Sequence, residues 1–202
     1  IVEKGAGLGS RIPDQDFAAV GAVIGKASDA GRADVVLKVR RPTDAELKGY
    51  KSGAAVIAIM DPYGNDAAVA ALAKAGVTAF SMEFMPRITR AQVMDVLSSQ
   101  ANLAGYQAVI DAAAEYDRAL PMMMTAAGTV PAAKAFIMGV GVAGLQAIAT
   151  ARRLGAVVTA TDVRPAVKEQ VQSLGAKFLA VEDEEFKAAE TAGGYAKEMS
   201  KE

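Results

Sequence analysis

Cysteine, histidine and tryptophan are all absent from this sequence of 202 residues, and aromatic residues make up only 5% of it. Without Cys, the chain has no disulfides, no catalytic thiolate and no Cys-ligated metal ion. Without His, it has no Ser-His-Asp triad and no imidazole proton shuttle, and most transition-metal sites are excluded. We therefore predict no metal site, and chemistry that depends on carboxylates, Lys and Tyr or on a cofactor.

Neither sign of charge dominates, because 22 Lys and Arg residues stand against 23 Asp and Glu residues, for a net charge of −1. This balance gives no reason to expect nucleic acid as a partner. No apolar run approaches the roughly 20 residues that span a bilayer, and the sequence contains no secretory signal. Any membrane association is therefore expected through a partner or another segment.

Apolar residues make up 52% of the chain and fall into short runs between Ala-rich stretches. Near-continuous apolar runs at residues 34–39, 55–60 and 77–82 predict strands of a parallel sheet that are buried on both faces. One helix is expected over residues 13–25, with Pro13 and Asp14 in its first turn. Another is expected over residues 65–75, with Asn65 as the N-cap and Gly76 at C′. The pattern predicts an α/β fold.

The longest predicted helix covers residues 89–119, with Thr89 and Gln92 as a capping box. It ends before Pro121, where we place a domain boundary between an N-terminal α/β domain with this linking helix (1–120) and a second domain (121–202). Polar residues recur along one face of the helix at three- or four-residue spacing: Gln92, Asp95, Ser98 or Ser99, Asn102 and Tyr106. This spacing alone favours a solvated helix face.

The second domain is predicted to have the order β-α-β-α-β. Strands are expected at residues 134–140, 156–161 and 177–181, and helices at residues 143–154 and from Pro165 to Gly175. That order is typical of the first half of a Rossmann-type, doubly wound sheet. Residues 182–202 are charged, and no further strand is predicted there. The chain also begins without an initiator Met, so we expect a fragment in which the Rossmann unit is incomplete.

Three glycines, Gly139, Gly141 and Gly144, stand between the first strand and helix of this domain. They are expected to permit a tight turn, to let the backbone approach a pyrophosphate, and to let helix and strand pack closely. Asp162, at the end of the next strand, is expected to accept hydrogen bonds from the adenosine ribose, which favours NAD(H) over NADP(H). Arg164 could weaken that preference. The alternative is a simple strand–helix turn in which Asp162 caps the next helix.

Several longer motifs carry a family resemblance. Residues 85–92 (MPRITRAQ), 94–100 (MDVLSSQ) and 102–106 (NLAGY) resemble the NAD(H)-binding domain of proton-translocating nicotinamide nucleotide transhydrogenase. The resemblance extends to residues 125–131 (TAAGTVP), to the glycine turn with residues 143–149 (AGLQAIA), and to residues 155–162 (GAVVTATD). It covers essentially the whole chain.

The resemblance implies a set of cofactor contacts. The nicotinamide end of NAD(H) would be held by Arg87, Gln92, Asp95 and Ser98, supported by Tyr106. Val142 of the glycine turn and Asp162, Val163 and Arg164 would contact the adenosine side. A mobile loop at residues 191–200 would close over the nucleotide through Gly194 and Tyr195, and the Gly193–Gly194 pair makes such mobility plausible.

The resemblance also implies the reaction and its partners. NADH bound here would transfer hydride directly to NADP⁺ on a partner domain, and the transfer would be coupled to proton translocation through a membrane domain. The chain would form a homodimer at the cytoplasmic face of the inner membrane. Positioning the two rings and excluding water would be its task, since the cofactors supply the chemistry.

Two other functions stay open at this point. Alanine dehydrogenase shares the fold and the glycine turn, and Lys38 resembles a Lys that binds the substrate carboxylate in that family. Its catalytic His would follow the strand that ends near Met60, whereas this sequence continues with Asp61 and Pro62. The missing His argues against amino-acid oxidation, and for Lys38 we favour a solvated strand-end residue. The other function is a non-enzymatic NAD sensor.

Overall fold

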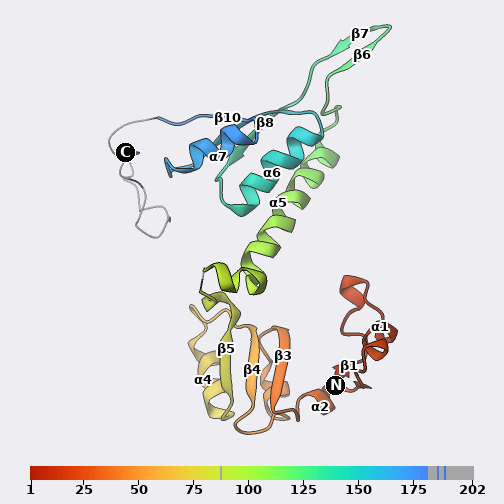
Figure 1. Cartoon of the computed structure of the whole chain (residues 1–202), viewed down its shortest axis with the longest axis vertical. Helices are drawn as coiled ribbons and strands as arrows, with labels where there is room; N and C mark the ends of the chain where they lie inside the picture. Colours follow the sequence, from red (N-terminus) through yellow and green to blue (C-terminus); the bar gives the residue numbers. More distant parts are fainter. Residues whose placement is uncertain (87, 182–185, 187–188, 190–202) are drawn as a thin grey trace. The chain divides into compact units, whose positions relative to one another are not determined.

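The computed structural model describes residues 1–86, 88–181, 186 and 189, and its chain divides into two compact units, Ile1–Val96 and Leu97–Glu202. The division falls at the start of a long helix, α5 (Val96–Glu115). The boundary expected from the sequence lies after this helix, near Pro121, and it stays a prediction. Both units are α/β structures with parallel strands, as the sequence predicts (Figure 1).

The larger sheet of the first unit has three parallel strands in the order β3-β4-β5. They are β3 (Val35–Arg40), β4 (Ala55–Ile59) and β5 (Thr78–Ser81). Two helices follow strands in this unit: α3 (Asp44–Leu47) and α4 (Asp66–Lys74). The three predicted strands are confirmed to within about a residue at each end, and Gly76 adopts the left-handed φ of +70° expected after a helix.

The core of the first unit covers one face of this sheet. Val36, Val56 and Ala58 are buried against Leu47 of α3 and Leu72 of α4. On the other face Val35, Leu37 and Val39 are 55%, 73% and 77% exposed. The prediction of burial on both faces is therefore wrong, because the described helices α3 and α4 pack against a single face.

The N-terminal segment differs from the predicted helix over residues 13–25. The helix is shorter, α1 (Asp14–Ala19), because Gly21 has a left-handed φ of +90°. Residues 24–25 instead form β2 (Ile24–Gly25), which pairs in parallel with β1 (Val2–Glu3). The short elements η1 (Leu8–Ser10) and α2 (Ala27–Ala30) complete this region.

The predicted continuous helix over residues 89–119 is also wrong in its N-terminal stretch. Strand β5 leads into a 3-10 turn, η2 (Met82–Phe84), and residues 89–94 form a second 3-10 helix, η3 (Thr89–Met94). Asp95 has a ψ of 87°, which no α-helix contains, and α5 starts directly after it. The N-cap position belongs to Ile88, so Thr89 and Gln92 form no capping box, and Gln92 and Asp95 do not share a helical face with Ser98.

The second unit contains the predicted β-α-β-α-β order, with a parallel sheet in the order β10-β9-β8. Its elements are β8 (Lys134–Met138), α6 (Val142–Arg153), β9 (Val157–Thr161), α7 (Val167–Ser173) and β10 (Lys177–Phe178). Ile148 of α6 and Val171 of α7 are fully buried against Val158 and Ala160 of β9. The order 3-2-1 along the sheet matches one half of a Rossmann fold.

A second feature of this unit is a close crossing of α5 and α6. A Cβ added to Gly105 of α5 would lie 2.0 Å from the carbonyl oxygen of Ala143 in α6. Gly105 is buried, so glycine is required here by packing. The crossing places α5 beside the start of α6.

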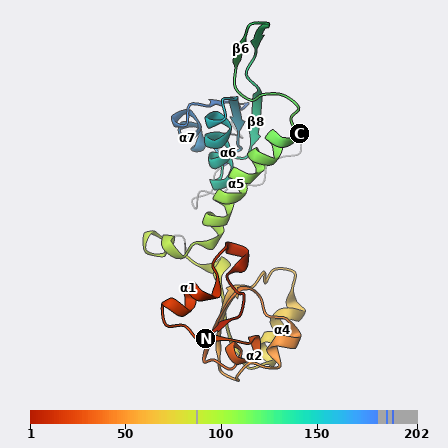
Figure 2. The same cartoon turned by 90° about the vertical axis from the view of Figure 1, so that its right-hand side faces the viewer.

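An antiparallel hairpin of the second unit was not predicted. It pairs β6 (Met123–Thr125) with β7 (Gly128–Val130) through a turn at residues 126–127, and Gly128, the first residue of β7, has a φ of +130°. Both views show the hairpin projecting from the rest of its unit (Figures 1 and 2). From sequence alone, this stretch was assigned to the start of the second domain and no strand was expected in it.

Glu46 stabilises the first unit at the start of α3. Its Oε2 accepts hydrogen bonds from the Thr43 backbone N–H at 2.7 Å and from the Thr43 hydroxyl at 2.9 Å, and its Oε1 pairs with Lys38 of β3. The Lys38 ammonium and the Thr43 N–H lower the pKa of Glu46 from 4.5 to about 2. Lys38 is thus held by Glu46 rather than left to solvent.

We expect Glu46→Gln to lower the free energy of unfolding at neutral pH. Because the pKa of Glu46 in the folded chain is depressed, its contribution is fully present above pH 4.5 and is lost as the pH falls toward about 2. Urea unfolding of wild type and variant across this pH interval measures the difference. A stability gap that stays constant down to the lower limit would contradict the prediction.

Candidate functional site

The glycine turn of the second unit connects β8 to α6. Gly139 ends the strand with a φ of +88°, and its N–H donates to the carbonyl of Thr161 at 2.9 Å. Gly141 occupies the N-cap position of α6 without any side chain to cap the helix, and the first helical turn contains no acidic residue. The N-terminal N–H groups and the positive end of the helix dipole are features that suit a phosphate group.

Each of the three glycines is required for a different reason. Gly139 needs its left-handed φ, and Gly144 needs the space, because a Cβ there would lie 1.9 Å from the carbonyl oxygen of Gly139. Gly141 has an ordinary φ of −79°, and an added Cβ would meet no atom within 4 Å. Neither its φ nor packing requires glycine at 141, where glycine is a favoured N-cap residue and the open space beside it leaves the backbone accessible to a ligand.

Asp162 ties this turn to the end of β9. Its Oδ2 accepts from the backbone N–H of Val140 at 2.6 Å, and its Oδ1 accepts from the backbone N–H of Arg164 at 2.8 Å. The Arg164 guanidinium donates to both oxygens, from Nε at 2.9 Å and from Nη2 at 3.0 Å. The Asp162 side chain is only 6% exposed, so this pairing compensates for the burial of its charge.

The carboxylate of Asp162 stays ionised at neutral pH. Burial alone would raise the pKa of Asp162, but hydrogen bonds from Arg164 and from the Val140 N–H outweigh it and hold the pKa below its usual value. A negative charge therefore lies at the carboxyl end of β9, next to the glycine turn. Val142 and Val163, 41% and 40% exposed, offer apolar surface beside it.

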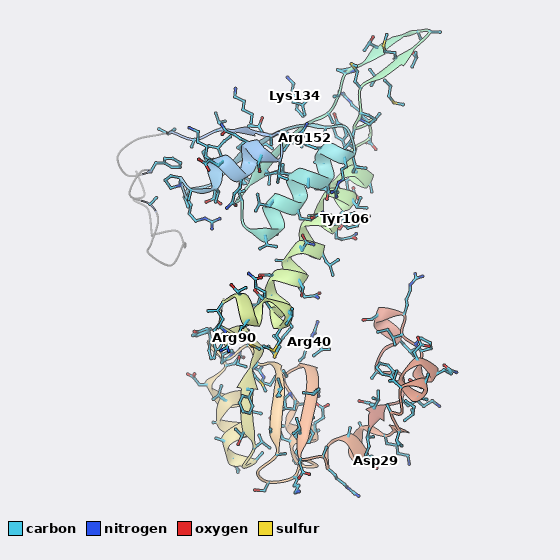
Figure 3. The ribbon with its side chains drawn as sticks, viewed as in Figure 1. Asp29, Arg40, Arg90, Tyr106, Lys134 and Arg152 are labelled. Carbon is cyan, nitrogen blue, oxygen red and sulfur yellow. The ribbon has the colours of Figure 1, made fainter. Side chains whose placement is uncertain are left out.

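The residues expected at the nicotinamide end lie in both units. Gln92 and Asp95 belong to the first unit, Gln92 exposed on η3 and Asp95 half-buried at its end. Ser98 and Tyr106 lie on α5 of the second unit, and Tyr106 is 48% exposed (Figure 3). Arg87, Gly194 and Tyr195 are outside the described residues. The structure thus brings together the adenosine-side residues 139–144, 162 and 164.

A second polar cluster, which was not predicted from the sequence, lies at the carboxyl edge of the first unit's sheet. Here Glu83 of η2 accepts hydrogen bonds from the backbone N–H groups of Met60 and Asp61 and from the Ser81 hydroxyl. Burial by itself raises the pKa of Glu83, and these hydrogen bonds lower it below its usual value. Glu83 is therefore a carboxylate at neutral pH.

An arginine, Arg41, contacts the other side of this cluster. Arg41 Nη1 donates to the carbonyl oxygens of both Met60 and Asp61, the latter at 2.9 Å. Asp61 has a left-handed φ of +46°, unusual for a residue with a side chain. Neighbouring Arg40 stands at the carboxyl end of β3 (Figure 3). The sequence signal for this cluster was weak: an acidic residue and a Pro directly after a strand.

Within the described residues, no group of three or more His, Cys, Asp or Glu side chains could hold a metal ion. No helix in this part of the chain has the length and apolar character needed to cross a membrane.

Comparisons with known proteins identify the family. The profile described as Alanine dehydrogenase/PNT, N-terminal domain, matches residues 1–104, and the one described as Alanine dehydrogenase/PNT, C-terminal domain, matches residues 108–199. The chain belongs to the alanine dehydrogenase/PNT family. Two profiles that together cover nearly the whole chain confirm the resemblance read from its motifs.

Individual members of the alanine dehydrogenase/PNT family are similar to this chain over its whole length. The chain is 59% identical over 209 residues to an NAD(P) transhydrogenase subunit alpha chain of Rhodospirillum rubrum, covering 100% of this chain and 54% of that protein. It is 45% identical over 203 residues to NAD(P) transhydrogenase subunit alpha of Haemophilus influenzae, covering 100% of this chain and 39% of that protein. The chain therefore spans about half the length of such relatives, or less.

Solved structures of the family show the same fold. The transhydrogenase from Sinorhizobium meliloti matches with a TM-score of 0.86 at 78% identity, over 89% of this chain and 54% of that one. An L-alanine dehydrogenase matches with a TM-score of 0.74 at 24% identity, over 88% and 50% of the two chains. The second likeness concerns the fold alone.

The three glycine roles lead to a paired prediction. Gly144→Ala should lower the free energy of unfolding by about 1–3 kcal/mol, because the methyl group overlaps backbone atoms that cannot move away cheaply. Gly141→Ala should cost less, no more than about 1 kcal/mol for the poorer N-cap, while weakening dinucleotide binding. Urea unfolding and nucleotide titration of both variants provide the measurements. Equal destabilisation in the two variants would contradict this division of roles.

Proposed function

We propose that this chain is the NAD(H)-binding component of a proton-translocating NAD(P) transhydrogenase. The observation that carries the proposal is the uncapped N-terminus of α6 at Gly141, with open space around this glycine, beside an ionised Asp162 at the neighbouring strand end. The names of the relatives support it, since NAD(P) transhydrogenase alpha subunits of Rhodospirillum rubrum and Haemophilus influenzae are 59% and 45% identical to this chain over its whole length.

The residues of the second unit fit the adenosine half of a dinucleotide. The backbone at Gly139, Gly141 and the start of α6 would hold the pyrophosphate, while Gly144 keeps the helix close to the strand. Asp162 would accept hydrogen bonds from the ribose hydroxyls, and its charge would repel a 2′-phosphate. Val142, Val163 and Arg164 would border the adenosine. NAD(H) is therefore the cofactor proposed for this chain, with NADP(H) on the partner domain.

The nicotinamide half would be held by Arg87, Gln92, Asp95 and Ser98, with Tyr106 in support. When bound, NADH supplies a hydride that passes directly to NADP⁺ on the partner domain. The side chains would orient the amide of the nicotinamide and exclude water. A transfer of this kind needs no general acid or base, which agrees with a chain that contains no His. Gly194 and Tyr195 would close over the nucleotide.

The proposed partners are an NADP(H)-binding domain and a membrane domain of the same enzyme, which couples the hydride transfer to proton translocation. The chain would be a peripheral component of that enzyme at the cytoplasmic face of the inner membrane. Its relatives are about twice as long or longer, which is consistent with further domains.

A homodimer through the β6–β7 hairpin belongs to the same proposal. Met122 and Met124 are 61% and 82% exposed, and Met123 is 45% exposed. A two-stranded hairpin is marginally stable alone in water, and exposed apolar side chains on a projecting element are typical of an interaction surface. A second copy of the chain would cover both the methionines and the open strand edges.

The second candidate function is an alanine dehydrogenase, favoured by the shared family profiles. Alanine dehydrogenase of Staphylococcus saprophyticus is 27% identical over 178 residues. Against this function, Lys38 is paired with Glu46, and no His is available for the acid–base step. Turnover of pyruvate and ammonium with NADH would favour it over the transhydrogenase.

The proposal is tested by titrating the chain with NADH and with NADPH, following nucleotide fluorescence. Wild type should bind NADH more tightly. Asp162→Asn keeps an oxygen for the Val140 N–H but loses the charge, so it should weaken NADH binding about fivefold to tenfold and reduce the preference over NADPH.

The matched control is Asp111→Asn, which makes the same charge change on α5, where Asp111 accepts a hydrogen bond from Gln107. It should bind both nucleotides like wild type. If folded wild-type protein binds NADH and NADPH equally, or binds neither, the proposed function fails.

For the dimer, Met124→Lys should raise the dimer dissociation constant by about tenfold or more, because a charge would be buried in an apolar contact. Val20→Lys is the control, since Val20 is 84% exposed and belongs to the first unit rather than to the hairpin. Light scattering on a sizing column measures the oligomeric state. Identical dimer fractions in both variants would exclude the hairpin as the interface.

A further inference from the structure

The polar cluster at the carboxyl edge of the first unit (Arg41, Met60, Asp61, Ser81 and Glu83) has no role in the proposed function. We propose that Glu83 is a positioning residue for nicotinamide binding, because it fixes the start of the segment that carries Gln92 and Asp95. This inference rests on the proposed function, in which these two residues contact the nicotinamide end of the cofactor.

Glu83 connects two neighbouring strand ends. Strands β4 and β5 run in parallel, so their carboxyl ends lie at the same edge of the sheet. Glu83 follows β5 by two residues, and its carboxylate accepts from Met60 N–H at 3.0 Å, from Asp61 N–H and from Ser81 Oγ at 2.5 Å. One side chain thereby holds η2 against the residues that follow β4.

The attachment point is itself rigidly held. Asp61 has a left-handed backbone, a conformation that persists where surrounding contacts enforce it and that is common at functional sites. Its N–H donates to Glu83, while its carbonyl accepts from Arg41 Nη1 and from Asn65 Nδ2, each at 2.9 Å. Both backbone polar groups of Asp61, its N–H and its carbonyl, are therefore held by side chains.

A second contact supports η2 from the same direction. The ring of Phe84 packs edge-to-face against the ring of Tyr63, with centroids 5.8 Å apart. Glu83 and Phe84 are thus both attached to the loop that follows β4, one by hydrogen bonds and the other by its ring. If the Glu83 carboxylate were removed, the contact between Phe84 and Tyr63 would be the side-chain contact left between η2 and this loop.

The segment beyond η2 consists of short turns. Successive backbone hydrogen bonds run from Met85 N–H to Met82, from Ala91 N–H to Ile88, and from Asp95 N–H to Gln92. Ala91 is 4% exposed, whereas Gln92 beside it is exposed. A shift of η2 would therefore be passed on to Gln92 and Asp95, because η3 follows η2 after only four residues of chain.

The experiment compares NADH with ADP-ribose, which has the adenosine, pyrophosphate and second ribose but no nicotinamide. In the full chain, Glu83→Gln removes one of the two carboxylate oxygens and brings an N–H donor toward backbone N–H groups. We expect the dissociation constant of NADH to rise about tenfold, which corresponds to the loss of one well-formed hydrogen bond. The dissociation constant of ADP-ribose should stay unchanged. The emission of bound NADH should also shift toward that of free NADH.

Glu46→Gln is the matched control, because Glu46 accepts backbone and side-chain hydrogen bonds in the same unit, from Thr43 and Lys38 rather than from residues around η2. It should lower stability without changing the ratio of the two dissociation constants. Ser81→Ala removes one donor to Glu83 and should change the ratio in the same direction by a smaller factor, which decides the matter if Glu83→Gln does not fold.

The outcomes separate the two proposals. Suppose that wild type binds NADH with the predicted preference over NADPH. If the folded Glu83 and Ser81 variants then keep the wild-type ratio of the NADH and ADP-ribose dissociation constants, or lose affinity for both ligands equally, the positioning role is refuted and the proposed function stands. If wild type binds ADP-ribose and NADH with equal affinity, no nicotinamide contact exists and the positioning role fails. If wild type binds neither ligand, both proposals fail.

Discussion

The hydrogen bond from the Val140 N–H to Asp162 is the contact on which the second unit's site depends. It joins two segments that are 22 positions apart in the chain, the glycine turn after β8 and the end of β9. Because the parallel ladder brings Met138 opposite Thr161, the two strand ends are already aligned, and the carboxylate links the loops beyond them. The turn is thereby held in one conformation without a ligand, so on the proposed function little entropy would be lost there on binding.

The first unit repeats this arrangement with different chemistry. There too a carboxylate, Glu83, accepts backbone N–H groups from the loop after the neighbouring strand. In both units the polar groups gather at the carboxyl ends of parallel strands, where ligands of open α/β sheets bind. The two carboxylates differ in how an arginine stands to them. Arg164 donates directly to Asp162, whereas Arg41 donates to the carbonyl oxygens of Met60 and Asp61, the residues whose N–H groups bind Glu83.

Much of this was predictable from sequence where one local signal decided the outcome. The strands of the two three-stranded sheets and the turn at residues 139–144 follow from apolar runs and from glycine spacing, and the structure confirms them. The break at Asp95 was not predictable, because propensity and polar spacing both favoured a continuous helix, and tertiary contacts override such preferences. Burial on both sheet faces was overestimated because an apolar run does not show which of its faces is covered.

The site was predictable in its residue types but not in its connections. The spacing of Gly139, Gly141, Gly144 and Asp162 pointed to a ribose acid, yet the bond from Asp162 to the turn depends on strand register. Asp61 and Glu83 gave almost no signal, since the left-handed backbone at Asp61 arises from long-range contacts with Arg41 and Glu83. Contacts between residues twenty or more positions apart are what a single sequence conveys least.

The pairing of Asp162 with Arg164 bears on how selective an adenosine site at this position can be. The carboxylate already has four donors, which is about the number that its two oxygens can accept. On the proposed function, a ribose hydroxyl would replace a guanidinium N–H instead of filling an empty position. The same guanidinium would re-pair with Asp162 when a sugar lacks that hydroxyl. A 2′-deoxy nucleotide would then be penalised far less than at a site whose acid is left unpaired, so Arg164 would make the enzyme tolerant of missing hydroxyls.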